Sequence, residues 1–205
     1  MRTIRRPGTH TVEIRRSRFV CTLARADDET AAVAFLTAHR RAHRDATHNC
    51  TAYVVGDRGE TAKSNDDGEP AGTAGTPMLE VLLRRDLTRT AAVVTRYFGG
   101  AKLGAAGLAR AYARAVTETL DLVGAVELRP LTALTLTAGH ADAARLLTGL
   151  HARGTAPDAV RYDPDAVRIT LTVPDDDVED VRARAAAATA GRAALERGAT
   201  RYGEV

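Results

Sequence analysis

The chain has 205 residues, of which 44% are apolar, so it can bury the core of one large domain or two small ones. Its charge is uneven: residues 1–129 hold 20 Lys and Arg against 15 Asp and Glu, a net of +5, and residues 130–205 hold 9 against 11, a net of −2. The sequence has no apolar stretch of about 18 residues for a membrane span, no apolar signal segment behind the arginines of residues 1–10, and only Cys21 and Cys50, which argues against a disulfide framework or zinc site and favours the cytoplasm.

The first half opens with two strands and a helix. Short apolar segments predict strands at residues 11–14 and 17–25. Asp27, Asp28 and Glu29 then supply a cap and negative charge for a helix start. The apolar stripe of this helix, at 3.6-residue spacing, consists of Ala32, Phe35, Leu36 and His39. A strand at residues 50–56 and a turn at residues 56–59 follow.

A loop rich in Gly and Pro, residues 64–77, comes next. It contains three carboxylates, three glycines and two prolines immediately before a helical pattern. This composition favours an ordered turn, and the free backbone N–H groups at a helix start suit an anion. Thr76 as the cap and Pro77 at the first helical position predict a helix that runs through Arg85.

A second loop of this kind connects a strand to a long helix. The continuous apolar centre of residues 91–97 predicts an interior strand. The helix is expected from about Gly104 to Val123. Its predicted inward face consists of Leu108, Ala111, Tyr112, Ala115 and Val116, and its outward face of Arg110, Arg114, Thr117 and Asp121.

We interpret Gly124–Pro130 as a boundary between domains at residues 1–127 and 131–205. Beyond it the prediction is strand, helix, strand, strand, helix, strand, at residues 131–137, 140–153, 156–162, 166–173, 175–188 and 193–202. Asp163–Asp165 forms the hairpin turn between the middle strands. The order βαββαβ is that of the ferredoxin-like unit, so the expected fold class is α+β with two domains.

Four cations around the second loop are candidates for phosphate binding: Arg96, Lys102, Arg110 and Arg114. The first two flank a glycine pair, and the last two repeat at i, i+4 on the exposed helix face. Mobile cations beside backbone donors at a helix N-terminus suit phosphate, and Tyr97 or Phe98 could stack on a base. The alternatives are a solvated surface, a codon-usage bias toward Arg and Ala, and aromatic side chains that belong to the core.

The carboxylates of the first loop allow two interpretations. Asp66, Asp67 and Glu69 could hold Mg²⁺, which prefers oxygen ligands, although the calcium-loop spacing and the nucleotide-binding P-loop are absent. Alternatively, the aspartates accept local backbone N–H groups and Glu69 pairs with an arginine such as Arg96. We favour this structural role and assign no metal ligand.

His48 and Cys50 could suggest a catalytic thiol. Two residues apart on a strand, their side chains leave the same face roughly 7 Å apart. A thiolate–imidazole pair needs direct hydrogen-bond reach, which only His43 from the preceding loop could otherwise supply. We therefore interpret Cys50 as a buried core residue and assign no catalytic residue.

Together the two loops resemble the signature of the IMPACT family. The family pattern D-D-G-E-P-x-G-T-A-G-x-P matches residues 66–77, and R-Y-Y/F-G-G-x-x-L-G-x-G-G-L-x-x-A-Y matches residues 96–112, except that Ala106 stands where the family commonly has Gly. Residues 48–52 are similar to the family's H-x-C-x-A strand. The resemblance implies a ribosomal-protein-like first domain, a second domain similar to the last domain of elongation factor G, and a role in regulating translation.

We therefore predict a non-enzymatic cytosolic protein, without a cofactor, that regulates translation by binding the ribosome or RNA, with a translation factor as a further candidate partner. The four cations would contact phosphates. The residues expected to shape the two loops are Asp66, Asp67, Gly68, Glu69, Gly72, Gly75, Gly99, Gly100 and Gly104. One alternative is an enzyme that acts on a small phosphorylated or peptide substrate, with or without Mg²⁺, and another is a protein–protein adaptor that uses the acidic second domain.

Overall fold

The computed structural model describes residues 1–204 and divides into two compact units, one of Met1–Leu128 and one that begins at Arg129. The fold class is α+β with two antiparallel sheets. None of the helices within residues 1–204 has both the length and the apolar character to cross a membrane.

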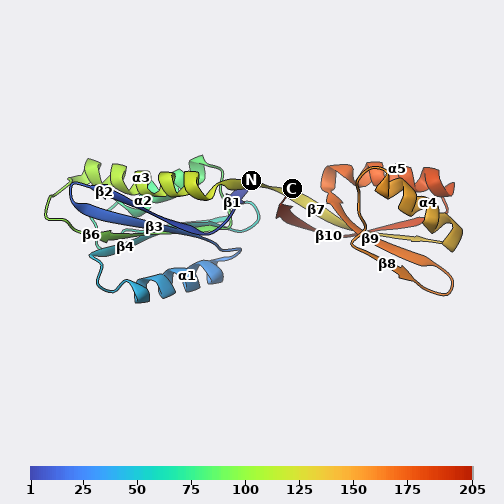
Figure 1. Ribbon diagram of the computed structural model, residues 1–205, viewed down its shortest axis with the longest axis horizontal. Helices are drawn as coiled ribbons and strands as arrows, with labels where there is room; N and C mark the ends of the chain where they lie inside the picture. The colour runs from blue at the N-terminus through green and yellow to red at the C-terminus, as the bar shows by residue number, and fades with distance from the viewer. Residues whose placement is uncertain (205) are drawn as a thin grey trace. The chain divides into compact units, whose positions relative to one another are not determined.

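The N-terminal unit is built on a five-stranded antiparallel sheet in the order β2-β3-β6-β4-β5. These strands are β2 (Gly8–Ile14), β3 (Ser17–Arg25), β6 (Thr90–Tyr97), β4 (His48–Val55) and β5 (Thr61–Asn65). In Figure 1, α2 (Gly75–Arg84) and α3 (Ala105–Val123) lie on one face of this sheet and α1 (Glu29–Ala42) lies on the other. The apolar run in β6 therefore has the predicted interior place, because both of its faces are covered by helices.

Each helix of this unit follows from its sequence pattern. The side chain of Asp28 accepts the N–H of Ala31 over 2.8 Å and caps α1. All five predicted inward residues of α3 are buried, whereas Arg110 and Arg114 are exposed. The larger core lies between the sheet and α2 with α3, and a smaller core lies under α1.

The C-terminal unit has the predicted βαββαβ order. Its elements are β7 (Ala125–Ala138), α4 (His140–His151), β8 (Ala159–Tyr162), β9 (Val167–Pro174), the 3₁₀ turn η1 (Asp175–Asp177), α5 (Val178–Thr189) and β10 (Ala194–Glu204). β7 lies between β9 and β10, and β8 pairs with the far edge of β9, which gives the ferredoxin-like strand arrangement. Both helices cover one face of this sheet (Figure 1).

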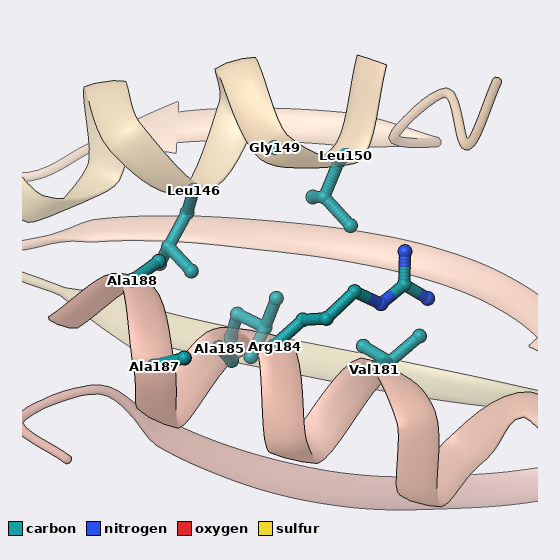
Figure 2. A pocket seen from close by; sticks show the side chains of 9 residues that line it. Leu146, Gly149, Leu150, Val181, Arg184, Ala185, Ala187 and Ala188 are labelled. Atoms are coloured by element: carbon teal, nitrogen blue, oxygen red, sulfur yellow. The ribbon is translucent and has the colours of Figure 1, made fainter. Parts of the chain in front are cut away.

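An apolar pocket of about 270 Å³ lies between α4 and α5. Leu146 and Leu150 approach it from α4, and Val181 and Ala188 from α5 (Figure 2). The small side chains on α5 leave this space unfilled, because four alanines occupy positions 185–188.

The structure corrects several predicted boundaries. The strand predicted at residues 131–137 is longer in the structure: β7 begins at Ala125, and its first residues pair with β1 (Arg2–Ile4). β1 and β5 fall outside the prediction, since one has three residues and the other is almost wholly exposed, so neither shows a periodic pattern. Strand β8 begins at Ala159 instead of residue 156, after Pro157, which has no N–H for a ladder.

Candidate anion-binding site

A buried ion pair ties the two loops together. Glu69 lies in the loop between β5 and α2, and Arg96 lies near the end of β6. The Nη1 group of Arg96 donates to Oε1 of Glu69 over 2.6 Å, and the hydroxyl of Tyr112 on α3 donates to the same oxygen over 2.7 Å. The two charged side chains are only 7% and 3% exposed, so the pairing raised from the sequence is present and is shielded from water.

Asp66 organises the start of α2. Its carboxylate accepts the N–H groups of Gly72, Ala74 and Gly75 over 2.8, 3.0 and 2.8 Å. Partial burial would raise the pKa of Asp66, but these three donors together hold it below its ordinary value. The helix therefore begins at Gly75, one residue before the predicted Thr76 cap, because Asp66 caps it from a distance in sequence.

Asp67 joins the same loop to β4. Its Oδ2 accepts the N–H of Asn49 over 2.6 Å, and its backbone carbonyl accepts Nδ1–H of His48 over 2.8 Å. The Nε2 atom of His48 then lies 3.8 Å from Oε2 of Glu69. All three loop carboxylates are thus engaged by protein donors, and within residues 1–204 no three His, Cys, Asp or Glu side chains converge as metal ligands would.

Cys50 is buried beneath this loop. Its Sγ lies 3.0 Å from the carbonyl oxygen of Asp66 and 3.3 Å from the hydroxyl of Tyr112. Burial raises the pKa of the Cys50 thiol to about 12, so the thiolate is not populated at neutral pH. This environment is that of a core cysteine, and His48 makes its hydrogen bond to the loop instead of to the thiol.

The second loop packs against the turn between β2 and β3. Arg15 and Arg16 form a two-residue turn, with φ of 48° and 65°, between the paired residues Ile14 and Ser17. Left-handed backbone is strained for residues other than glycine, so this turn holds two arginines at a conformational cost. Gly99 lies directly against the turn: a Cβ there would be 1.9 Å from the carbonyl oxygen of Arg16.

Two hollows flank the second loop. The first, which we call the loop pocket, has a volume of about 320 Å³ and is lined by Thr47, His48, Glu69, Pro70, Arg96, Phe98, Lys102, Leu103, Gly104, Ala105 and Leu108. The second, which we call the α3 groove, has a volume of about 310 Å³ and is lined by Ile14, Arg15, Leu103, Gly107, Arg110, Ala111 and Arg114. Leu103 lines both, so the two hollows are neighbours.

The structure divides the four predicted cations between these hollows. Arg96 and Lys102 line the loop pocket, whereas Arg110 and Arg114 line the α3 groove. Arg114 is paired with Glu118 over 2.6 Å, but neither Lys102 nor Arg110 has an ion-pair partner within residues 1–204.

Arg15 is a candidate that the sequence reasoning missed. It lines the α3 groove, and its Nη1 lies 3.4 Å from the carbonyl oxygen of Lys102. The sequence did contain a sign of its position: the strands predicted at residues 11–14 and 17–25 leave a gap of two residues, which indicates a tight hairpin turn. Because that turn meets the second loop, five cations gather at one end of the unit; we call Arg15, Arg16, Lys102, Arg110 and Arg114 the basic end.

The glycines expected to shape the loops occupy special positions. Gly68, Gly72, Gly100 and Gly104 have positive φ. Gly75 and Gly99 instead allow close approach: a Cβ on Gly75 would lie 2.7 Å from the backbone nitrogen of Asn65.

Comparison with known proteins agrees with the two-loop architecture. The model of the Impact N-terminal domain matches residues 15–120, just over half of the chain. IMPACT family member YvyE of Bacillus subtilis is 54% identical over 125 residues, which are 61% of this chain and 58% of that protein. IMPACT family member YigZ of Escherichia coli is 42% identical over 148 residues, 71% of each chain.

A solved structure described as that of a hypothetical protein superposes with a TM-score of 0.63 at 34% identity and covers 95% of both chains. The present chain thus spans a little over half of the length of the Bacillus relative and nearly all of this solved chain. Since the matched region contains both loops, the Glu69–Arg96 pair and most of α3, the chain belongs to the IMPACT family.

Proposed function

We propose that this protein is a non-enzymatic, cytosolic regulator of translation that binds RNA, alone or in the ribosome, through the basic end of its N-terminal unit. The observation that carries the proposal is the gathering of exposed cations at the basic end, in the α3 groove and in the adjoining loop pocket. Arg15, Lys102 and Arg110 are exposed and have no carboxylate partner within residues 1–204. Uncompensated cations spaced along a groove attract a polyanion, because each neutralised phosphate releases condensed counterions.

Two further features support this proposal. Phe98 is 47% exposed at the edge of the loop pocket, where a ring can stack on an unpaired base. The strained turn at Arg15 and Arg16 keeps two guanidinium groups at the basic end in spite of its conformational cost, and such strain is concentrated at functional sites.

Affinity for single-stranded RNA across a salt series tests this proposal. Each phosphate contact contributes about −0.7 to the slope of log K against log salt for a single strand. Replacing both Arg110 and Arg114 with Ala is expected to make the slope shallower by about 1.4, from two lost contacts. Arg84→Ala is the matched control, because Arg84 is an exposed arginine on α2, outside the basic end. An unchanged slope in the double variant would remove the α3 groove from the proposal.

A second candidate function rests on the loop pocket itself. Its volume of about 320 Å³ is suited to a small molecule, and it combines His48, Glu69 and Arg96 with the exposed Lys102. An enzyme acting on a small phosphorylated or peptide substrate would use these groups. Thermal-shift measurements with nucleotides, phosphopeptides and Mg²⁺ test it, since a ligand at a hundred times its dissociation constant adds about 2.7 kcal/mol of stability.

A further inference from the structure

The start of α3 opens into the loop pocket without a side-chain cap. Gly104 is the N-cap residue of this 19-residue helix and supplies no side-chain hydrogen bond. The first intrahelical bond runs from the N–H of Leu108 to the carbonyl of Gly104, so the N–H groups of residues 105–107 precede the helical ladder. Both Gly104 and Ala105 line the loop pocket. Donors of this kind, together with the helix dipole, favour an anion.

An incompletely satisfied guanidinium lines the same pocket. Arg96 is 5% exposed, and its Nε has no hydrogen-bond partner within residues 1–204, although Nη1 is paired with Glu69. The guanidinium carbon also lies over two aromatic rings, 5.4 Å from the centroid of Phe19 and 5.5 Å from that of Phe98. A buried cation with unused donor capacity is costly to keep unless something completes its hydrogen bonds.

The pocket also joins the α3 groove. Leu103 lines both hollows, and Lys102 beside it has no ion-pair partner within the described part of the chain. An RNA strand whose phosphates follow Arg110 and Arg15 along the α3 groove would therefore bring its terminal nucleotide to the loop pocket. The lining of this pocket includes Lys102, the first residues of α3 and Arg96. Phe98, also in the lining and half exposed, offers a ring face for the terminal base.

We propose that the loop pocket binds the terminal phosphate monoester of an RNA strand whose adjacent phosphates lie in the α3 groove. The proposal rests on the RNA-binding function argued above and assigns the pocket a separate task, recognition of the strand end. A monoester offers three terminal oxygens to the helix N–H groups, the ammonium and the guanidinium, whereas an internal phosphodiester has only two non-bridging oxygens and continues in both directions.

Isothermal titration with three oligoribonucleotides of one sequence tests the assignment: one with a 5′-phosphate, one with a 3′-phosphate and one with hydroxyls at both ends. One phosphorylated end is expected to raise the affinity about tenfold or more, as charge-assisted hydrogen bonds would. Lys102→Ala should abolish the preference, and Arg84→Ala should preserve it.

A second variant separates a loss of end recognition from a loss of folding. Ala105→Asp places a carboxylate at the first turn of α3, where it is favourable to the helix dipole but occupies the proposed anion position. It should fold at least as well as the native chain and lose the end preference. If this variant keeps the preference, the pocket is not the recognition site.

The outcomes separate this inference from the function on which it rests. Equal binding of all three oligonucleotides would overturn end recognition and leave RNA binding standing. Binding of adenosine monophosphate over adenosine, dependent on Lys102, without RNA binding would overturn both in favour of the small-molecule function. Absence of binding to any of these probes would also overturn both.

Discussion

The two units of the chain differ in the polar groups that they enclose. Beneath the loops, the N-terminal unit encloses the Glu69–Arg96 pair together with the hydroxyl of Tyr112. The core of the C-terminal unit is made of Leu, Val, Ile and Ala side chains. The buried carboxylate of Asp142, in the first turn of α4, pairs with the exposed Arg192 and Arg145.

This contrast supports the proposed location of the binding site in the N-terminal unit. A buried ion pair seldom stabilises a fold more than well-packed apolar residues of the same volume would. The N-terminal unit nevertheless retains one at the wall of the loop pocket and adds strained arginines nearby. The C-terminal unit instead follows the ordinary rules for stability, with a leucine-rich core and surface ion pairs. The buried polar groups of the first unit therefore support the binding role proposed for it.

Breaking the buried pair should have the largest effect. Glu69→Ala leaves the Arg96 guanidinium buried without its carboxylate, which is expected to destabilise the N-terminal unit by about 3–5 kcal/mol. Cys21 and Cys50 are both fully buried in this unit, so native-state thiol exchange measures its opening.

A matched control and a rescue sharpen this result. Glu80→Ala removes an exposed carboxylate of α2 that pairs with Arg84, and should cost less than about 1 kcal/mol. Adding Arg96→Met to Glu69→Ala should recover part of the loss, because the uncompensated charge is gone. If the double variant is no more stable than Glu69→Ala alone, the uncompensated charge of Arg96 is not the cause of the lost stability.

The apolar core of the other unit supplies the next largest effect. Leu136 is fully buried on β7 and borders the pocket between α4 and α5. Leu136→Ala enlarges a space that is already unfilled and is expected to destabilise the C-terminal unit by about 2–5 kcal/mol. Hydrogen exchange should accelerate in β9 and α4, while thiol exchange at Cys21 and Cys50 stays unchanged. Faster thiol exchange would show that the two units unfold together.

The C-terminal unit was also the easier one to predict from the sequence. Its strands and helices have regular apolar periods and clear turns, so their order could be predicted along the chain. The start of β7 was predicted six residues too late, because Pro130 and the polar residues beside it hide the apolar alternation, and the residues that pair with β1 do not need such a pattern.

The site could be predicted only in part. Glycine spacing predicted both loops, and the charges gave Lys102 and Arg110 as candidates. Which cations share a hollow depends on contacts between distant segments, such as Gly99 against the turn at Arg16, and no local pattern encodes such a contact. Asp66 likewise caps a helix that begins nine residues later, so sequence reasoning assigned the cap to Thr76.

Relieving the strained turn should stabilise the fold and weaken binding. Arg15→Asn with Arg16→Gly installs residues that adopt positive φ readily, and the free energy of unfolding should rise by about 1 kcal/mol. Affinity for RNA should fall, because two cations leave the basic end. Urea unfolding and RNA titration, with Arg84→Ala as a charge control, measure both. A gain in stability with no loss of RNA affinity would remove this turn from the site.

The smallest effect concerns the face of the sheet under α1. The Nε2–H group of His39 donates to the hydroxyl oxygen of Thr95 over 3.0 Å, because the hydroxyl proton of Thr95 goes to Oδ1 of Asn49. The His39 ring stacks on that of His43 at 4.4 Å between centroids. Burial, and secondarily the neighbouring His43, lower the pKa of His39 from 6.5 to about 4. Between these values the unfolded chain binds more protons than the folded one, so stability is full above about pH 6.5 and is lost as the pH falls toward 4.

His39→Gln removes this titration while keeping a side chain that can hydrogen-bond to Thr95. Thiol exchange is slow at acidic pH, so urea unfolding monitored by circular dichroism is the suitable measurement at pH 7.5, 6.0 and 5.0. The native chain should lose more stability over this range than the variant, and the difference should develop below pH 6.5. Equal losses would assign the acid sensitivity to other groups. The half-buried ring of His39 would then contribute only packing to the core under α1, like the apolar residues around it.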